Sequence, residues 1–284
     1  MQYRQHTVQC VSPSGLHRMA YVEWGARDNP RVLVCVHGLT RNGRDFDALA
    51  QALAAHYRVV CPDVVGRGQS SRLRDPSAYG IPQYVADMVT LIARLDVDSV
   101  DWVGTSMGGL IGMALASQQG TPIRKLLLND VGPVITTQSL ERIATYVGTD
   151  PTWATFDEAL AYIKVISAPF GQLDDAQWRH LTEHSIGQRP DRRWGFLYDP
   201  LIAAPFKAAF SGEPIDLWPI YERITCPTLV VRGADSDLLT RETWQQMGSR
   251  GPRAKLAEIP GVGHAPMFLD DHQIGIARDF LLAA

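Results

Sequence analysis

Ser106 stands within Gly104-Thr105-Ser106-Met107-Gly108-Gly109, between an apolar run at Val100–Val103 and an apolar helical run at Leu110–Ala116. Glycines on both sides of a serine permit a tight strand-to-helix turn, because a side chain there would clash with neighbouring backbone. Such a turn exposes the hydroxyl at the helix N-terminus. The pattern predicts Ser106 as a nucleophile, with a serine that merely caps a helix after a glycine-rich turn as the alternative.

A serine hydroxyl is a weak nucleophile until a base removes its proton, so the chain must also supply a histidine. His264 fits best, because Gly261-Val262-Gly263-His264-Ala265-Pro266 lies between the last strand-like run and a final helix predicted at Ile274–Leu282. On a parallel sheet, this loop emerges at the same edge as the turn at Ser106. We expect solvated surface positions for His6, His17, His56, His180, His184 and His272.

The segment His37-Gly38-Leu39-Thr40 follows another apolar run directly. Its backbone can direct one N–H, that of Leu39, at a developing oxyanion, and the residue after the nucleophile, Met107, can supply a second. We expect His37 to brace this loop by hydrogen bonding rather than to act as the base. Arg41, just beyond the loop, is a candidate for binding a substrate carboxylate, with simple solvation as the alternative.

The elements that must position these residues follow an alternating pattern. Short apolar runs bounded by turn residues are separated by segments of helical period, which predicts a mostly parallel sheet with helices on both faces. The first two runs resemble an antiparallel hairpin at the sheet edge. Strands are predicted at His6–Val11, Arg18–Trp24, Arg31–Val36, Tyr57–Cys61, Val100–Val103, Ile123–Asn129, Thr228–Arg232 and Lys255–Ile259.

The alternation stops between Gly132 and about Pro219, where no strand pattern is evident. Helical segments are predicted there at Ser139–Val147, Phe156–Ser167 and Asp175–Ile186. We interpret residues 133–219 as a helical lid, and residues 1–132 and 220–284 as the core domain. Trp194 and Phe196 are candidates for a substrate pocket, with packing inside the lid as the alternative.

Composition excludes several function classes. A net charge of −3 without any Lys/Arg run argues against nucleic acid as a partner. A polar N-terminus and the lack of a long apolar stretch predict a cytoplasmic protein with no membrane association. Four scattered cysteines without metal-like spacing indicate reduced thiols, so we expect no metal and no cofactor. We expect a small-molecule substrate as the partner, and both monomer and homodimer remain open.

Taken together, four motifs in order give the chain a resemblance to the α/β-hydrolase superfamily: the segments at 37–40, 63–70 (DVVGRGQS), 104–109 and 261–266. It is similar to the lid-bearing branch with carboxylesterases, lactonases and carbon–carbon bond hydrolases. The resemblance implies an eight-stranded, mostly parallel sheet with a lid inserted after strand six. It also implies a Ser-His-Asp triad, a backbone oxyanion hole and a loop at 63–70 that shapes the pocket floor.

The acid of the triad departs from the commonest pattern of the family. That pattern places a carboxylate three residues after the glycine that ends strand seven, whereas this chain has Ser236 there, flanked by Asp235 and Asp237. Some members carry the acid after strand six, where this chain has Asp130. We favour Asp130 and keep Asp237 as the alternative. For each of them, the non-catalytic alternative is a loop carboxylate that caps a nearby helix or turn.

These features predict acyl transfer from a carboxylic ester to water. Cleavage of a carbon–carbon bond in a ring-cleavage diketone, or of an amide, uses the same triad and remains an alternative. A small-molecule receptor that keeps the triad but turns over negligibly is the alternative outside enzymes. Ser106 disfavours a haloalkane dehalogenase, whose nucleophile is a carboxylate.

Overall fold

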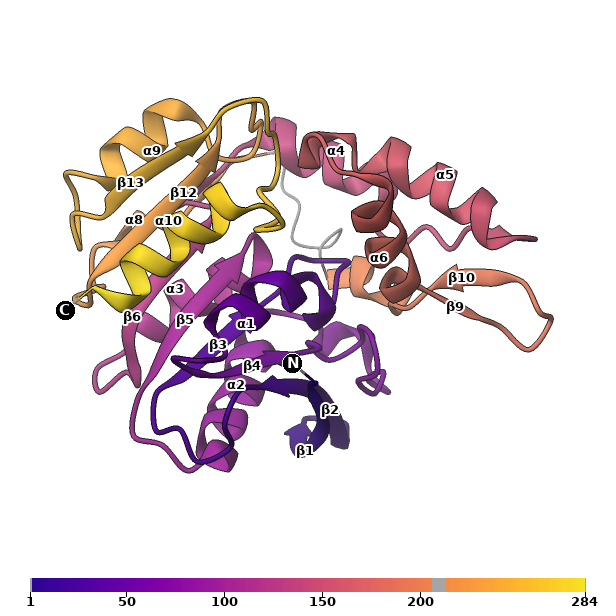
Figure 1. Ribbon diagram of the computed structural model, residues 1–284, viewed down its shortest axis with the longest axis horizontal. Coiled ribbons are helices and arrows are strands. Elements are labelled where there is room, and N and C mark those ends of the chain that lie inside the picture. The colour runs from indigo at the N-terminus through magenta and orange to yellow at the C-terminus, as the bar shows by residue number, and fades with distance from the viewer. Residues whose placement is uncertain (1, 206–212, 284) are drawn as a thin grey trace.

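An eight-stranded sheet forms the centre of the computed structural model, which describes residues 2–205 and 213–283 (Figure 1). The order is β1-β2-β4-β3-β5-β6-β12-β13. β1 and β2 form the predicted antiparallel hairpin at one edge, β2 pairs antiparallel with β4, and the remaining pairs are parallel. The strands are Arg4–Ser12 (β1), Gly15–Trp24 (β2), Val32–Val36 (β3), Arg58–Pro62 (β4), Val100–Thr105 (β5), Ile123–Asn129 (β6), Thr228–Gly233 (β12) and Lys255–Ile259 (β13).

Helices cover both faces of the sheet, which explains why the central strands are apolar throughout. In β3, Leu33 and Cys35 pack with one layer of helices, while Val34 and Val36 pack with the opposite layer. The first layer is Asp47–Leu53 (α1) and Asp271–Leu282 (α10). The second is Ile81–Leu95 (α2), Met107–Ala116 (α3), Trp218–Tyr221 (α8) and Arg241–Met247 (α9). The predicted sheet architecture is confirmed.

Between β6 and β12 the chain forms an insertion, whose labelled elements α4, α5, α6, β9 and β10 lie to one side of the sheet in Figure 1. The three helices predicted there are present, at Thr137–Tyr146 (α4), Phe156–Ile166 (α5) and Asp175–Ser185 (α6). Side chains of Thr155 and Asp174 begin α5 and α6 with capping boxes, which satisfy the free N–H groups of the first turn.

The expectation that this insertion contains no strands is wrong. Two- and three-residue strands form a small sheet, β8-β10-β9, and a separate pair, β11-β7. Strands this short leave no alternating pattern long enough to recognise in a sequence. These strands are Val134–Ile135 (β7), Thr152–Trp153 (β8), Ile186–Gln188 (β9), Trp194–Phe196 (β10) and Ile215–Asp216 (β11).

Short 3₁₀ turns occur in other connections of the chain, at Gly43–Phe46, Pro76–Ala78, Ala168–Phe170 and Pro200–Ile202.

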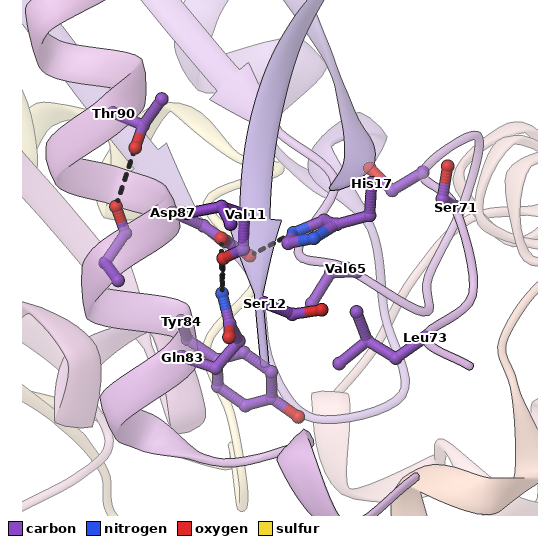
Figure 2. A network of polar contacts seen from close by, with 12 residues as sticks. Val11, Ser12, His17, Val65, Ser71, Leu73, Gln83, Tyr84, Asp87 and Thr90 are labelled. Atoms are coloured by element: carbon purple, nitrogen blue, oxygen red, sulfur yellow. Dashed lines mark hydrogen bonds and ion pairs between the residues drawn. The ribbon is translucent and has the colours of Figure 1, made fainter. Parts of the chain in front are cut away.

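His17 is buried, which corrects the expectation of a solvated position. Figure 2 shows its ring directed at Asp87. Its Nε2 lies 3.0 Å from Asp87 Oδ2, and the other oxygen of Asp87 accepts a 2.8 Å hydrogen bond from Gln83. Gln83 also donates to the Val11 carbonyl oxygen at 2.9 Å. Helix α2 covers this part of the hairpin, so a polar strand residue pairs with the helix instead of with water.

The four cysteines are free thiols, and Cys10, Cys35 and Cys61 are buried. Within residues 2–205 and 213–283, no helix combines the length and the apolar character needed to cross a membrane.

Candidate active site

Two glycines make the turn at Ser106 possible. A Cβ on Gly104 would lie 2.3 Å from the Gly108 carbonyl oxygen, and a Cβ on Gly108 would lie 2.0 Å from the Val36 carbonyl oxygen. Neither position therefore accepts a side chain. Ser106 has φ 52° and ψ −115°, a conformation that costs free energy for a non-glycine residue and that clusters at functional sites. Its N–H donates to the Asn129 carbonyl oxygen at 3.0 Å, which ties the turn to β6.

Three side chains from distant parts of the chain meet at this turn. His264 Nε2 lies 3.0 Å from Ser106 Oγ, and His264 Nδ1 lies 2.7 Å from Asp130 Oδ2. The His264 side chain is 13% exposed, whereas the Asp130 side chain is fully buried. This arrangement can transfer the serine proton to an imidazole whose other nitrogen donates to a carboxylate.

The Asp130 carboxylate accepts two further hydrogen bonds. Gly233 N–H donates to Oδ1 at 2.9 Å, and the Ser236 hydroxyl donates to Oδ2 at 2.6 Å. Together with His264, these donors compensate for the hydration that the carboxylate loses on burial. Ser236, which occupies the position of the usual acid, is thus a hydrogen-bond donor to the aspartate at the end of β6.

Asp237 does not contact His264 in this arrangement. Its two carboxylate oxygens accept hydrogen bonds from Nε and Nη2 of Arg142, the second at 3.0 Å. The Asp235 backbone N–H donates to the Val262 carbonyl oxygen at 2.9 Å. The structure therefore brings Asp130, and not Asp237, to the imidazole.

The two predicted oxyanion donors flank the serine. Leu39 lines the same cavity as Ser106, and a Cβ on Gly38 would lie 3.7 Å from Ser106 Cβ, so this loop runs beside the nucleophile. Met107 begins α3, where the helix dipole favours negative charge. The roles of both amides stay predictions.

His37 is fully buried beneath this loop. Its Nδ1 lies 2.7 Å from the Gly38 carbonyl oxygen, and its Nε2 accepts the Val64 N–H at 2.9 Å. Burial lowers its pKa to about 3, so the ring is neutral near pH 7. Both nitrogens are occupied by backbone, which suits a bracing residue and not a general base.

The cavity at Ser106 is bounded by the core on one side and the insertion on the other. Phe196 contributes to it, whereas Trp194 packs edge-on against Phe156, with ring centroids 5.8 Å apart. Arg41 also contributes, but it donates to Asp45 and Ser185. The lining residues are Gly38, Leu39, Thr40, Arg41, Asp45, Thr105, Ser106, Arg142, Ile143, Tyr146, Thr149, Tyr162, Ile163, Ile166, Ser167, Pro169, Phe170, Phe196, Tyr198, His264, Ala265 and Met267.

Two groups in the described part of the chain have the residue types of a metal site, and neither lines this cavity. Asp87 of the first group, Cys10, His17 and Asp87, already accepts hydrogen bonds from His17 and Gln83. Asp47 of the second group, Asp47, His180 and His184, is paired with Arg44. That the reaction needs no metal or cofactor stays a prediction.

A match to the model of the alpha/beta hydrolase family extends over residues 33–277, from β3 into α10. The chain belongs to the alpha/beta hydrolase family. A 3-hydroxybutyrate-oligomer hydrolase from Cupriavidus necator is 55% identical, over 98% of this chain and 97% of that protein. Among solved structures, a putative hydrolase from Rickettsia typhi superposes with a TM-score of 0.91 at 32% identity, covering 99% of both chains. An alpha/beta hydrolase from Novosphingobium aromaticivorans gives a TM-score of 0.88 at 36% identity, covering 98% of both. The protein is therefore an enzyme of the hydrolase class.

Three residues of this α/β hydrolase were not found by sequence reasoning. Ser236 stands where the usual acid is missing, and its place three residues after Gly233, the last residue of β12, was the available signal. Asn129, at the end of β6, joins the end of β5 to the loop that carries His264, through hydrogen bonds from Nδ2 to Thr105 Oγ1 at 2.9 Å and to the Pro266 carbonyl oxygen at 2.7 Å. Arg67, buried within the motif at 63–70, donates from Nε to the Leu39 carbonyl oxygen at 2.8 Å.

The buried imidazole of His37 predicts a pH effect on the stability of the hydrolase. Its pKa is about 3 in the native state against an ordinary value of 6.5, so between these values the unfolded state binds more protons. The free energy of unfolding must then fall as pH drops below 6.5, by up to about 1.4 kcal/mol per pH unit for this group. Urea unfolding at a series of pH values below 6.5 measures the slope.

His37→Gln is the matching control, since a glutamine oxygen can still accept the Val64 N–H. We expect a smaller slope of unfolding free energy against pH in this variant. An unchanged slope in a folded variant would contradict the assignment to His37.

Proposed function

We propose that this hydrolase cleaves carboxylic esters, with Ser106 as nucleophile, His264 as general base and Asp130 as the acid. The observation that carries the proposal is the unbroken hydrogen-bond chain between them, 2.7 Å from Asp130 to His264 and 3.0 Å from His264 to Ser106. Distances in this range are what proton transfer within a triad requires.

In the proposed reaction, Ser106 Oγ attacks the ester carbonyl carbon while His264 Nε2 takes its proton. Backbone N–H groups of Leu39 and Met107 stabilise the negative oxygen of the tetrahedral intermediate. The bond between the carbonyl carbon and the alcohol oxygen then breaks, and His264 transfers the proton it took from Ser106 to the leaving alcohol oxygen. A water molecule, deprotonated by His264, then releases the acid from Ser106 by the same steps in reverse. Asp130 holds the imidazole in the required tautomer and stabilises its protonated form.

We propose short linear oligomers of 3-hydroxybutyrate as the substrate. The 55% identity to the Cupriavidus necator 3-hydroxybutyrate-oligomer hydrolase along 98% of the chain supports this choice. The cavity lining also suits such a molecule. Ile163 and Phe170 offer apolar surface for the methyl groups, while the hydroxyl of Tyr162 can donate to an ester carbonyl oxygen.

Two assays test the two levels of this proposal separately. Labelling by a fluorophosphonate, blocked by Ser106→Ala, is expected if Ser106 is an activated nucleophile; a wild-type protein that is not labelled would overturn the mechanism. The wild-type enzyme, without fluorophosphonate treatment, is expected to release 3-hydroxybutyrate from the linear dimer and trimer. A protein that is labelled and hydrolyses p-nitrophenyl butyrate, yet leaves both oligomers intact, would overturn only the substrate.

We further propose that residues 133–219 act as a lid that selects the substrate. The support is that α4, α5 and β10 contribute Arg142, Ile163 and Phe196 to the cavity opposite Ser106. A lid composed in this way adds binding contacts remote from the reacting atoms, and such contacts discriminate among acyl chains.

Phe196 and Trp194 provide a matched pair for testing the lid. Phe196→Ala is expected to change the ratio of kcat/KM between p-nitrophenyl butyrate and p-nitrophenyl acetate by roughly 10-fold, the effect of one lost apolar contact. Trp194→Ala should lower the melting temperature and leave that ratio within about twofold, because Trp194 packs with Phe156. Equal changes on both esters in Phe196→Ala would indicate packing rather than selection.

We also propose a cytoplasmic location, supported by the four free thiols, which a reducing compartment keeps unoxidised. Fractionation of the cells that make the protein tests this directly. Recovery in an extracytoplasmic fraction would overturn it.

A further inference from the structure

Two arginines reach the proposed ester-cleaving cavity, Arg41 and Arg142. A hydroxy-acid oligomer carries one free carboxylate, at the end opposite its free hydroxyl. An arginine guanidinium is the side chain best suited to bind a carboxylate, because its planar N–H groups match the two oxygens. Which of the two arginines can do so depends on the hydrogen bonds that each already makes.

All three nitrogens of Arg41 are engaged within the protein. Nε and Nη2 donate to the two oxygens of Asp45, at 2.8 and 2.5 Å, and Nη1 donates to Ser185 Oγ at 2.7 Å. Its side chain is only 14% exposed. Arg41 joins the core to the end of α6, and a substrate carboxylate would have to break these contacts to reach it.

Arg142 is held differently. Asp237 accepts hydrogen bonds from Nε and Nη2, the Tyr146 hydroxyl lies within hydrogen-bonding reach of the guanidinium, and the side chain is 37% exposed. A guanidinium has five N–H groups, so donors remain for a carboxylate. Tyr146, one turn further along α4, lines the same cavity. Burial raises the pKa of Tyr146, so its hydroxyl keeps its proton and can donate a hydrogen bond beside the guanidinium.

We propose that Arg142 binds the free carboxylate of the substrate, with Asp237 as the residue that positions it. This inference rests on the proposed function and adds a direction to it. A bound carboxylate sets which ester bond of the oligomer reaches Ser106, so the enzyme cuts at a set number of units from the carboxyl end. It also gives Asp237 a part in the site, as the partner of Arg142 and not of His264.

The test compares the linear 3-hydroxybutyrate dimer with its methyl ester, which keeps the same internal ester bond without the negative charge. Release of methyl 3-hydroxybutyrate reports cleavage of the internal bond, and release of methanol reports cleavage of the added ester. We expect the wild-type enzyme to have a lower KM for the acid than for the methyl ester. Arg142→Gln should raise KM for the acid by about 10- to 100-fold, the range for a lost hydrogen bond to a charged group, with kcat within about threefold. Its KM for the methyl ester should be unchanged. Arg142→Lys keeps the positive charge but not the planar pair of N–H donors, so its KM for the acid should lie between those of the wild type and Arg142→Gln.

Arg241→Gln is the matched control, because it removes the same charge from another exposed carboxylate pair, with Glu258. It should leave the preference for the acid intact. Equal losses on acid and methyl ester in Arg142→Gln, or a wild-type enzyme that does not distinguish them, would overturn the carboxylate site. A wild-type enzyme that cuts neither dimer but cleaves p-nitrophenyl butyrate would instead overturn the proposed substrate, and the carboxylate site with it.

Discussion

Replacement of Ser106 by alanine is expected to lower kcat for ester hydrolysis by about 10⁶-fold, the loss found when the nucleophile of a serine protease is removed. The reason is that Ser106 Oγ lies 3.0 Å from His264 Nε2 and no other hydroxyl is needed for the proposed chemistry. The melting temperature should barely change, since only one hydrogen bond is lost. Hydrolysis of p-nitrophenyl butyrate and thermal unfolding measure the two quantities.

His264→Ala should be about as damaging, because nucleophile and base act as a unit. His272→Ala, an exposed histidine on α10, is the control and should retain full activity. An active Ser106→Ala protein would end the serine-hydrolase mechanism. A folded His37→Ala protein with a greater loss than His264→Ala would show that the base is assigned wrongly.

Asp130→Asn is expected to reduce kcat by about 10⁴-fold, as the corresponding change does in the serine-protease triad. An amide keeps the shape but lets the imidazole adopt the wrong tautomer. Asn is also compatible with the backbone at this position, where φ is 52°, because Asn tolerates the left-handed region better than most residues. The variant should therefore fold, which circular dichroism would verify.

Asp237→Asn is the comparison that decides between the two candidate acids. Its carboxylate pairs with Arg142 and not with His264, so we expect kcat on p-nitrophenyl butyrate to stay within about threefold of wild type. A reversed ranking, with Asp237→Asn the more damaging in folded proteins, would move the acid to the loop after β12. Asp130 would then be a structural residue that accepts hydrogen bonds from Gly233 and Ser236.

Much of the fold and part of the site follow from local sequence patterns. Each of the eight strands of the main sheet was predicted, because apolar runs between turn residues report burial on both faces of a parallel sheet. The tight turn at Ser106 could also be predicted from the sequence, because Gly104 and Gly108 each meet a local steric requirement that a side chain would violate. Ser106 was predicted from the glycine-flanked turn after β5, and His264 from the glycine-rich loop that follows β13.

The sequence favoured Asp130 as the acid but kept Asp237 open, because the contacts that separate the two residues lie in no local pattern. Asp130 and Asp237 both follow strands at the same edge, and the residues that separate them in role are far away in the chain. Asp130 meets His264 across 134 positions, and Ser236 turns toward Asp130 across 106. Arg142, which lies in the insertion 95 positions away, donates hydrogen bonds to Asp237.

His17 illustrates the same limit. Its polar strand pattern indicated solvent, whereas helix α2 brings Asp87 to it across 70 positions. Burial periodicity is a property of neighbouring residues, and the sequence by itself therefore determined the strands of the main sheet and the glycine turn, and it predicted Ser106 as nucleophile and His264 as base. Pairing between charged and polar side chains depends on where separate elements come together. Only the tertiary structure therefore shows that His264 meets Asp130, which the sequence favoured while keeping Asp237 open, and that Arg142 meets Asp237 and His17 meets Asp87.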